Sequence, residues 1–270
     1  MAKHDWFEHT LKVPKIIAEI GSTWKAENGK EDIDNCLTCC NMAAEYGATA
    51  VKFQMFTHKE LYGIDGDDKY ALPRDFIPKL KDYCDDLGIE FMCSAFSVEG
   101  YKFLMPYVET HKIASSCVGN QNLIDYASTS KDVTWLVSDG MFDVPVWRNW
   151  VPMVCASVYP AIIQDYDLSE IYRYNVYGPW GLSDHTTRYD LARMLRANGC
   201  SYFEKHVDFL ISRHDNPDFH HSILPEQFGR YTDAIRKMEV GRPKKLKLEA
   251  REKWGDRWDN EVMGYFRPKA

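Results

Sequence analysis

Charged and hydroxyl-bearing residues recur in this sequence where apolar, β-branched segments end. In four of these segments two polar residues stand at positions i and i+2, and alternate residues of a β-strand point to the same face. Each pair can therefore project together into one space. The pairs are Lys52 with Gln54, Ser157 with Tyr159, Ser183 with His185, and Glu204 with His206. Single candidates in other segments are Glu19, Ser94, Lys112, Ser115 and Ser138.

Two of these residues, His185 and His206, come from neighbouring segments of the series. Imidazoles held rigidly on adjacent strands suit a divalent transition metal that takes its other ligands from water or substrate oxygens. The sequence therefore predicts a metal site at His185 and His206. The alternative is a pair of neutral histidines whose ring nitrogens are hydrogen-bonded within the core.

Lysines inside a protein are costly to bury without a partner of opposite charge. A bound phosphate or carboxylate would offset that cost for Lys52 and Lys112, and an internal ion pair with Glu19 or Glu204 is the alternative. A buried serine alone is a weak signal because it often bonds to its own backbone. Three serines together are a stronger sign of a binding site, because we expect all of them at one rim of the fold. They are Ser94, Ser115 and Ser138.

These side chains can meet only if the fold brings the ends of the segments together. Eight strand-like segments alternate with segments of helical periodicity, which favours parallel strands joined by crossover helices. This alternation matches an α/β fold, the (β/α)8 TIM barrel of about 250 residues, whose active sites lie at the C-terminal ends of the strands. We expect a single domain over residues 14–240, followed by a short C-terminal extension over 241–270.

The expected elements follow from the hydrophobic periodicity. Strands are expected at 15–21, 48–56, 89–96, 111–116, 134–139, 153–159, 181–186 and 202–209. Helices are expected at 31–46, 74–87, 98–108, 122–130, 168–174, 188–198 and 225–238. The fifth unit, 141–151, contains Pro145 and leaves little room before the sixth strand, so we expect a short helix or a loop there.

Composition and charge exclude several classes of protein. Of the 270 residues, 45% are hydrophobic and 27% charged, which is ordinary for a globular chain. The sequence has no run of about 18 apolar residues and no apolar secretory signal near its start, so we expect a cytoplasmic protein without a membrane partner. The net charge is −7 and basic residues cluster only at 242–247, which argues against a nucleic-acid partner. The eight cysteines are expected to be reduced, and Cys36, Cys39 and Cys40 to pack in the core rather than bind zinc.

Eight short motifs occur along the chain in the same order as the expected strands, most of them at the strand ends. They are Ile17-Ala18-Glu19-Ile20-Gly21, Val51-Lys52-Phe53-Gln54, Lys112-Ile113-Ala114-Ser115, Ser138-Asp139-Gly140-Met141, residues 155–160, Gly181-Leu182-Ser183-Asp184-His185-Thr186, Glu204-Lys205-His206 and Pro217-Asp218-Phe219-His220. Each motif alone is weak, but the ordered set is specific. From about residue 14 to 238 the chain resembles the sialic acid (N-acetylneuraminate) synthase family.

The resemblance implies an enzyme that condenses phosphoenolpyruvate with an aldose, such as an N-acetylmannosamine-like amino sugar, to give a nonulosonic acid and phosphate. It implies a homo-oligomer, expected to be a dimer, and a divalent metal at His185 and His206, commonly Mn²⁺, with Mg²⁺ or Co²⁺ as alternatives. Its catalytic residues would be Glu19, Lys52, Glu204 and Asp218. Its substrate-binding residues would be Gln54, Ser94, Lys112, Ser115, Ser138, Ser157, Tyr159 and Ser183.

The sequence departs from this family in features that concern the acceptor sugar. Members usually carry a C-terminal domain resembling type III antifreeze protein, whereas only residues 241–270 follow the expected barrel here. The family's Asn-His after the first strand is replaced by Thr23-Trp24, and its Ser-Thr-Gly-Met by Ser138-Asp139-Gly140-Met141. We expect the extension to pack on the barrel or a neighbouring subunit, or to cover the active site.

Other functions stay open at this point. A synthase of the 3-deoxy-octulosonate- or heptulosonate-phosphate type would need basic residues at the rim for a sugar phosphate, and Arg188, Arg213 and residues 242–247 are the candidates. A class I aldolase would form a Schiff base on Lys52 or Lys112. A non-catalytic sugar-binding barrel is the alternative outside enzymes.

Overall fold

The computed structural model describes residues 13–26, 32–130, 132–144, 149–212 and 214–238, and the pairs 258–259 and 267–268. The chain divides into two units, Met1–Met238 and Glu239–Ala270. Within the second unit the described residues are the antiparallel pair β9 (Trp258–Asp259) and β10 (Arg267–Pro268). The packing or covering role expected for the extension therefore lies outside the described residues.

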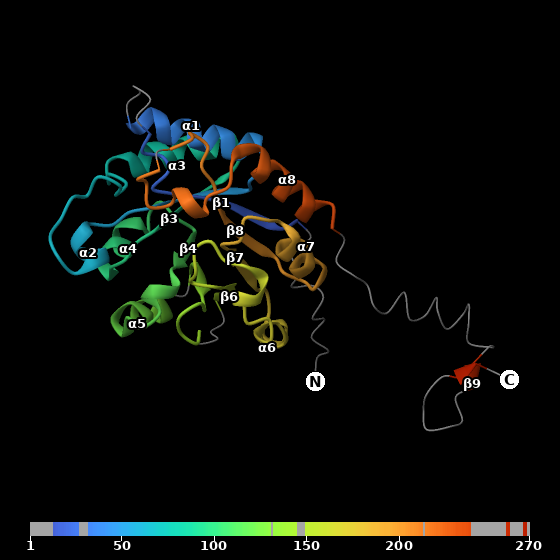
Figure 1. Cartoon of the computed structure of the whole chain (residues 1–270). Helices are drawn as coiled ribbons and strands as arrows, with labels where there is room; N and C mark the ends of the chain where they lie inside the picture. The colour runs from blue at the N-terminus through green and yellow to red at the C-terminus, as the bar shows by residue number, and fades with distance from the viewer. Residues whose placement is uncertain are drawn as a thin grey trace. The chain divides into compact units, whose positions relative to one another are not determined.

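Eight parallel strands form one sheet in the order β3-β2-β1-β8-β7-β6-β5-β4 (Figure 1). The two outermost strands, β3 and β4, are in contact with each other, so the sheet curls into a nearly closed barrel. The predicted (β/α)8 TIM barrel is thus confirmed. The strands are β1 (Lys15–Gly21), β2 (Ala50–Gln54), β3 (Glu90–Ser94), β4 (Thr110–Ile113), β5 (Thr134–Ser138), β6 (Trp150–Cys155), β7 (Gly181–Asp184) and β8 (Tyr202–His206).

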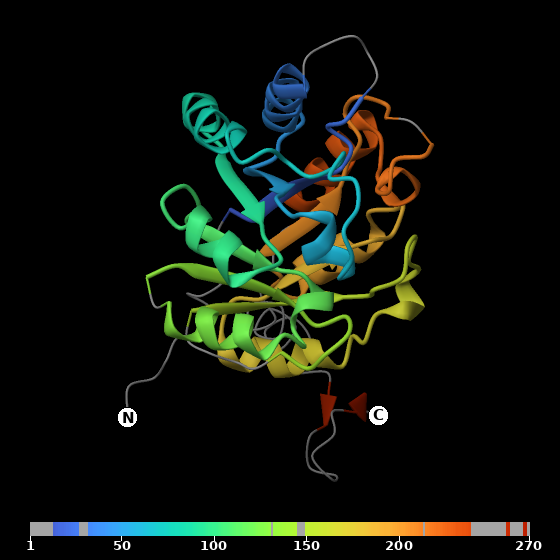
Figure 2. The same cartoon turned by 90° about the vertical axis from the view of Figure 1, so that its left-hand side faces the viewer.

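Helices surround the strands (Figure 2). All seven predicted helices are confirmed, with ends that differ from the prediction by four residues or fewer, and a short helix, α2, was not predicted. None of the described helices is both long and apolar enough to span a lipid bilayer. The helices are α1 (Asp32–Glu45), α2 (His58–Tyr62), α3 (Phe76–Leu87), α4 (Val98–Leu104), α5 (Gln121–Thr129), α6 (Glu170–Tyr177), α7 (Asp190–Ala197) and α8 (Pro225–Arg236), with 3₁₀ turns η1 (Ser115–Cys117), η2 (Ile163–Asp165) and η3 (Phe219–His221).

Helix α1 shows how a helix covers the strands. Its buried side chains include Cys36, Cys39, Cys40 and Ala43, which the 3.6-residue period places on one face. The three cysteines are completely buried in the core between helices and strands. Cys40 Sγ lies 3.6 Å from Cys84 Sγ of α3, and all eight cysteines are free thiols. The prediction that the cluster packs in the core is confirmed.

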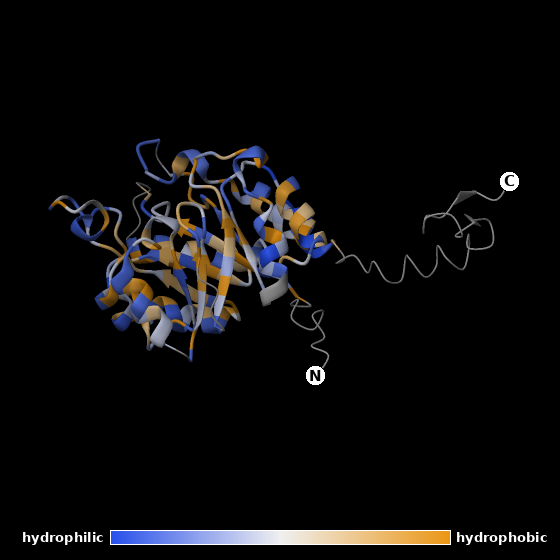
Figure 3. Cartoon of the chain, turned by 90° about the horizontal axis from the view of Figure 1, so that it is seen from below, coloured by the Kyte–Doolittle hydropathy of each residue, from blue (hydrophilic) through white to orange (hydrophobic). Residues whose placement is uncertain are grey.

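The barrel interior has an apolar layer drawn from strands alone. It contains Ile17, Ala50, Met92, Leu136, Val151 and Met153. Two residues further along β1 and β2, the same inward face carries Glu19 and Lys52, because side chains alternate along a strand. The apolar layer therefore forms the floor of the barrel interior, beneath the polar side chains at the C-terminal ends of the strands. Figure 3 shows the strands at the centre of the barrel coloured mainly as hydrophobic.

Seven of the eight predicted strands extend one to four residues beyond the observed ends, and the prediction was wrong about those ends; three of them carry site residues. The β6–β7 ladder stops at Cys155↔Ser183, so Ser157 and Tyr159 lie in the loop after β6, which itself begins three residues earlier than expected. His185 likewise follows β7. Ser115 opens η1, where the Cys117 N–H bonds the Ala114 carbonyl rather than a neighbouring strand. Polar and apolar residues still alternate past each strand end, which is why the pattern predicted longer strands.

The fifth unit has no helix among its described residues, 139–144 and 149. This agrees with the prediction that its helix is short or replaced by a loop. Residues 145–148 lie outside the described residues.

Candidate active site

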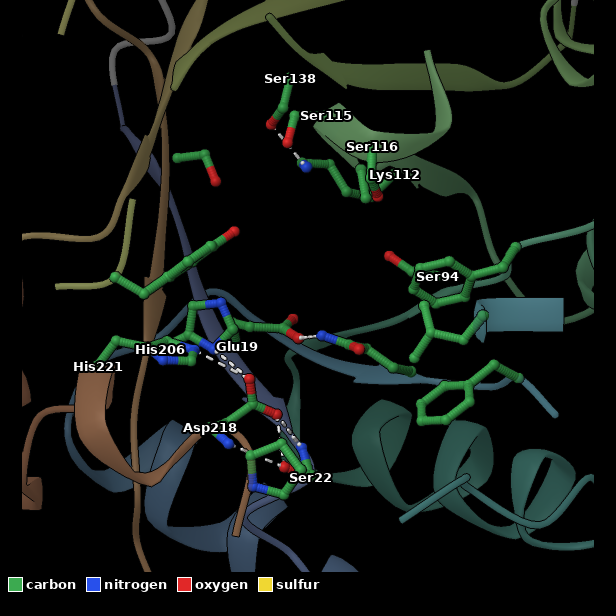
Figure 4. Close-up of a pocket in the computed structure, with 18 of the residues that line it drawn as sticks. Glu19, Ser22, Ser94, Lys112, Ser115, Ser116, Ser138, His206, Asp218 and His221 are labelled. Carbon is green, nitrogen blue, oxygen red and sulfur yellow. Dashed lines mark hydrogen bonds and ion pairs between the residues drawn. The ribbon is translucent and has the colours of Figure 1, made fainter. Parts of the chain in front are cut away.

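A cavity of about 790 Å³ opens at the C-terminal ends of the barrel strands. The structure brings all the sequence-predicted site residues together in its lining, including those whose strands were predicted too long. Figure 4 shows Lys112, Ser115 and Ser138 together on one side of this cavity, across from His206, His221 and Asp218. The predicted residues in the lining are Glu19, Lys52, Gln54, Ser94, Lys112, Ser115, Ser138, Ser157, Tyr159, Ser183, His185, Glu204, His206 and Asp218.

Two carboxylates and two ammonium groups interact at the bottom of the cavity. Glu19 and Lys52 are direct register partners on β1 and β2, and their Oε2 and Nζ atoms lie 2.5 Å apart. Glu204 on β8 lies between the lysines, with Oε2 at 3.6 Å from Lys52 Nζ and Oε1 at 3.5 Å from Lys112 Nζ. The ion pairs weighed as an alternative to a bound anion are therefore present. All four side chains are almost entirely buried.

The two carboxylates differ in acidity because their surroundings differ. Burial raises the pKa of Glu19 to about 7, although the charge of Lys52 opposes this shift. Burial would also raise the pKa of Glu204, but the charges of Lys112 and Lys52 outweigh it and hold that pKa at about 2. Glu204 is thus a permanent counter-charge at neutral pH, while Glu19 can gain or lose a proton there. Two carboxyl groups with such different pKa values suit two roles, a fixed charge at Glu204 and an acid/base group at Glu19.

Hydroxyl groups surround the lysines. Lys52 Nζ donates to Ser94 Oγ at 3.2 Å, and Lys112 Nζ donates to Ser138 Oγ at 2.8 Å. Above them, Ser115 Oγ and Ser157 Oγ are 2.7 Å apart, which ties η1 to the loop after β6. Two ammonium groups and several hydroxyls that converge on one cavity offer hydrogen-bond donors and charge that suit a small oxyanion such as a phosphate or carboxylate.

The two histidines predicted as ligands lie beside each other, with ring centroids 5.6 Å apart. His185 Nδ1 donates to the Ala156 carbonyl at 2.6 Å, which fixes the ring and leaves the Nε2 lone pair available. Burial lowers the pKa of His185 to about 4 and holds the pKa of His206 well below its usual value. Both imidazoles are therefore neutral at pH 7, as metal ligation requires.

Asp218 reaches the same place from the loop after β8. Its Oδ2 accepts hydrogen bonds from the Ser22 backbone N–H at 2.7 Å and from Ser22 Oγ at 2.6 Å. Its Oδ1 lies 2.9 Å from His221 Nε2 and 3.6 Å from His206 Nδ1. Gly21 allows this approach because its φ is +53° and an added Cβ would lie 2.3 Å from Asp218 Oδ2.

The donor set fits a divalent cation. His206 Nδ1 is buried and makes no hydrogen bond within the described part of the chain. His206, Asp218 and His221 each offer one ligand atom, and these atoms lie within 4.8 Å of one another. Imidazole nitrogen combined with carboxylate oxygen suits Mn²⁺, Co²⁺ or Fe²⁺ better than Ca²⁺, which prefers oxygen ligands alone.

Comparison with known proteins places this site in a family. Residues 39–245 match the model of the family described as NeuB, which is well over half of the chain. The chain belongs to the NeuB family. The family predicted from the ordered motifs is thereby confirmed, and so is the general expectation of an enzyme that uses phosphoenolpyruvate and a sugar.

Individual NeuB relatives are distant. The N,N'-diacetyllegionaminic acid synthase of Legionella pneumophila is 27% identical over 263 residues, covering 83% of this chain and 72% of that protein. The spore coat polysaccharide biosynthesis protein SpsE of Bacillus subtilis is 27% identical over 260 residues, covering 83% of this chain and 67% of that protein. The crystal structure of an N-acetylneuraminic acid (sialic acid) synthetase from Leptospira borgpetersenii has a TM-score of 0.71 at 23% identity, covers 89% of this chain and 92% of that chain, and supports the fold.

The departures from the NeuB-family motifs fall outside the cavity lining. Thr23 Oγ1 donates to the carbonyls of Ile20 and Val207, at 2.7 and 2.9 Å, and ties β1 to β8. Trp24 is buried in the core. Asp139 accepts hydrogen bonds from the Cys155 backbone N–H and from the Tyr174 hydroxyl. These replacements therefore serve packing and loop geometry.

Several residues that line the cavity were not predicted. His221 lies three positions after Asp218, and that spacing was the available signal in the Asp218-to-His221 segment. The segment between β2 and α3, which contains α2, contributes a second group, and its length between two predicted elements was the signal that could have found it. Its Tyr70 hydroxyl donates to the Asp215 carbonyl at 3.5 Å, which links this loop to the one after β8. The unpredicted polar residues are Ser22, His58, Asp67, Lys69, Tyr70, Ser116 and His221.

Proposed function

We propose that this chain catalyses the divalent-cation-dependent condensation of phosphoenolpyruvate with an N-acetylated aldose to give a nonulosonic acid and phosphate. The observation that carries the proposal is the convergence of Lys52, Lys112 and their serines beside Glu19, whose pKa is raised to about 7. Such a site binds a small trianion and keeps one carboxyl group able to move a proton. Membership of the NeuB family supports this choice of reaction.

The phosphate and carboxylate of phosphoenolpyruvate would lie against the lysines and serines, which balance their charge. A divalent cation at His185 and His206, Mn²⁺ in our proposal, would polarise the aldehyde of the acceptor sugar. The π bond between C2 and C3 of phosphoenolpyruvate opens, so that C3 bonds to the aldehyde carbon and C2 becomes cationic, while the aldehyde oxygen takes up a proton from solvent. Water adds to C2 and gives up its proton to the ionised Glu19 carboxylate. The bond between C2 and the phosphate oxygen then breaks as the C2 hydroxyl passes its remaining proton to the departing phosphate, which releases hydrogen phosphate and leaves a 2-keto group.

Charge argues against the aldolase alternative at Lys52. A Schiff base needs a neutral lysine amine. Burial would lower the pKa of Lys52, but the charges of Glu19 and Glu204 outweigh it and raise that pKa above its ordinary value. The amine of Lys52 is therefore protonated at neutral pH and suits anion binding.

A sugar-phosphate acceptor has less support at the rim. Arg188 is exposed and its Nε bonds Asp190 Oδ2 at 2.7 Å, away from the cavity lining. Arg213 and residues 242–247 lie outside the described residues. Lys69 does line the cavity, so the NeuB family membership carries our preference for an acceptor without a phosphate group.

The proposal is tested by phosphate release from phosphoenolpyruvate in the presence of Mn²⁺. The acceptor panel contains N-acetylhexosamines, diacetamido sugars and sugar phosphates. We expect release that depends on one of the unphosphorylated amino sugars. Release that depends on a sugar phosphate would favour the octulosonate type, and release without any acceptor would contradict the condensation. A dimer and a location in the cytoplasm remain part of the proposal, and light scattering on the purified chain would test the dimer.

A further inference from the structure

One group of side chains in the cavity has ligand chemistry that goes beyond the histidine pair predicted from the sequence. His206 ends β8, and Asp218 and His221 return to it at the end of the loop that follows, with η3 carrying His221. The rings of His206 and His221 have centroids 4.5 Å apart, closer than the 5.6 Å between His206 and His185. Figure 4 shows His206 and His221 side by side with Asp218 next to them.

The loop is built so that His221 points inward. His221 is buried, whereas His220 next to it is exposed. The Ser222 N–H and Oγ both donate to the Asp218 carbonyl, at 3.2 and 2.7 Å, and these bonds close the turn that carries His221. The Tyr159 ring lies over the group, with its centroid 4.7 Å from that of His221 and 4.4 Å from that of His185.

The ring nitrogen of His206 that faces this group lacks a hydrogen bond. His206 is 7% exposed, and its Nδ1 has no hydrogen-bond partner in the described ranges although it lies 3.6 Å from Asp218 Oδ1. A buried polar atom without a partner costs free energy. A bound cation would satisfy that nitrogen, and the carboxylate beside it would balance part of the cation's charge.

We propose that His221 and Asp218 are ligands of the divalent cation together with His206. This inference rests on the proposed function for the presence of the cation, and it concerns which side chains hold it. His206 and His221 supply two imidazole nitrogens, and Asp218 supplies a carboxylate oxygen. With a third nitrogen from His185, positions stay open for substrate oxygens, and this ligand chemistry is typical of Mn²⁺, Fe²⁺ and Co²⁺ sites. His185 stays the ligand predicted from the sequence, and its ring lies 6.5 Å from that of His221.

A competing explanation is that His221 only orients Asp218 through the 2.9 Å hydrogen bond. Loss of a residue that orients a ligand also weakens metal binding, by about 10- to 100-fold. Affinity alone therefore does not separate the two roles. The number of nitrogen atoms bonded to the cation does separate them, because an orienting histidine contributes none.

The experiment uses the full chain with Mn²⁺ and without phosphoenolpyruvate or sugar. Mn²⁺ binding is titrated by electron paramagnetic resonance, and pulsed spectra at saturating Mn²⁺ count the coordinated ring nitrogens. We expect His221→Ala to weaken binding by at least 100-fold and to remove one nitrogen. His221→Asp should recover most of the affinity, because carboxylate oxygen suits Mn²⁺, and it should still lack that nitrogen. His220→Ala, a matched change of the exposed neighbour, should bind like the parent.

An unchanged nitrogen count in His221→Ala or His221→Asp would overturn the inference. If His206→Ala loses Mn²⁺ while both His221 variants bind it like the parent, the inference fails and the cation of the proposed function stands. A parent chain that does not bind Mn²⁺ would overturn both. His221→Asp keeps the test usable if His221→Ala does not fold.

Discussion

Glu19 and Lys52 are neighbours across the β1–β2 ladder, and their charged atoms meet at 2.5 Å above the apolar floor of the barrel. Because Glu19 is completely buried, this single ion pair does not lower its pKa to that of an ordinary carboxyl group. The same lysine donates to Ser94 and faces Glu204. The geometry therefore joins Glu19, which we propose as the acid/base group, directly to Lys52, which we propose binds the anion.

Removing the charge of Glu19 should stop proton transfer while keeping the site folded. We expect Glu19→Gln to reduce kcat by about 100-fold or more, the usual contribution of a general base. Phosphoenolpyruvate binding should change little, because Lys52 and Lys112 remain. Phosphate release at saturating substrates measures kcat, and a variant with the parental kcat would show that Glu19 does not take the proton.

Activity should depend on the ionisation of Glu19. Its pKa is about 7 and the base must be deprotonated to act, so log kcat/KM should rise with pH and level off above about 7. The rise should disappear in Glu19→Gln. A rise that persists in that variant would assign the ionisation to another group.

Folding stability should respond to pH in the opposite direction. A carboxyl group whose pKa is raised from 4.5 to about 7 binds its proton more tightly in the folded state. The contribution of this protonated group to the free energy of unfolding is therefore full below pH 4.5, and it decreases as pH rises towards 7. In urea titrations, the free energy of unfolding of the parent relative to Glu19→Gln should fall over this interval. A flat difference between the two proteins would contradict the raised pKa.

The lysines should contribute mainly to anion binding. Lys112→Ala and Lys52→Ala should each weaken phosphoenolpyruvate binding by about 2 to 4 kcal/mol, because each removes a charge-assisted contact in a desolvated site. Calorimetric titration measures the affinity, and Lys237→Ala, an exposed lysine paired with Asp233 on α8, serves as the control. A variant that is folded and binds like the parent would make that lysine structural.

Metal removal should abolish turnover. Chelation should stop phosphate release, and Mn²⁺ or a similar ion should restore it. His206→Ala should lose both the metal and the activity. Full activity after chelation, checked by metal analysis of the same sample, would exclude the predicted metal site.

Much of this architecture could be predicted because it follows from local patterns. Glu19 and Lys52 were found because strand alternation fixes which side chains face inward, whatever the loops do. The ends of β4, β6 and β7 were placed too late because the alternation continues into the loops that hold Ser115, Ser157 and His185. The prediction that these three residues meet at one site was still correct, because their loops bend towards the same rim of the barrel and all three line the cavity.

His221 and Tyr70 could not be found in this way. The position of His221 depends on a loop that folds back onto β8, held by contacts between Asp218 and Ser22 almost two hundred residues apart in the chain. Tyr70 lines the cavity from the β2–α3 loop, whose path follows no hydrophobic period. The three-residue spacing of Asp218 and His221 can be read in the sequence, but a single sequence does not show that their loop folds back onto β8.

The most direct test of the central claim follows the carbon atoms of phosphoenolpyruvate. Phosphoenolpyruvate labelled with ¹³C at C2 and C3 is incubated with the chain, Mn²⁺ and the panel of N-acetylated aldoses, and ¹³C and ³¹P spectra are recorded together. We predict that both labels enter one 2-keto acid, with C3 as a methylene bonded to the former aldehyde carbon and one phosphate released per product. Label that stays in phosphoenolpyruvate, or appears only as pyruvate, with every aldose would contradict the account.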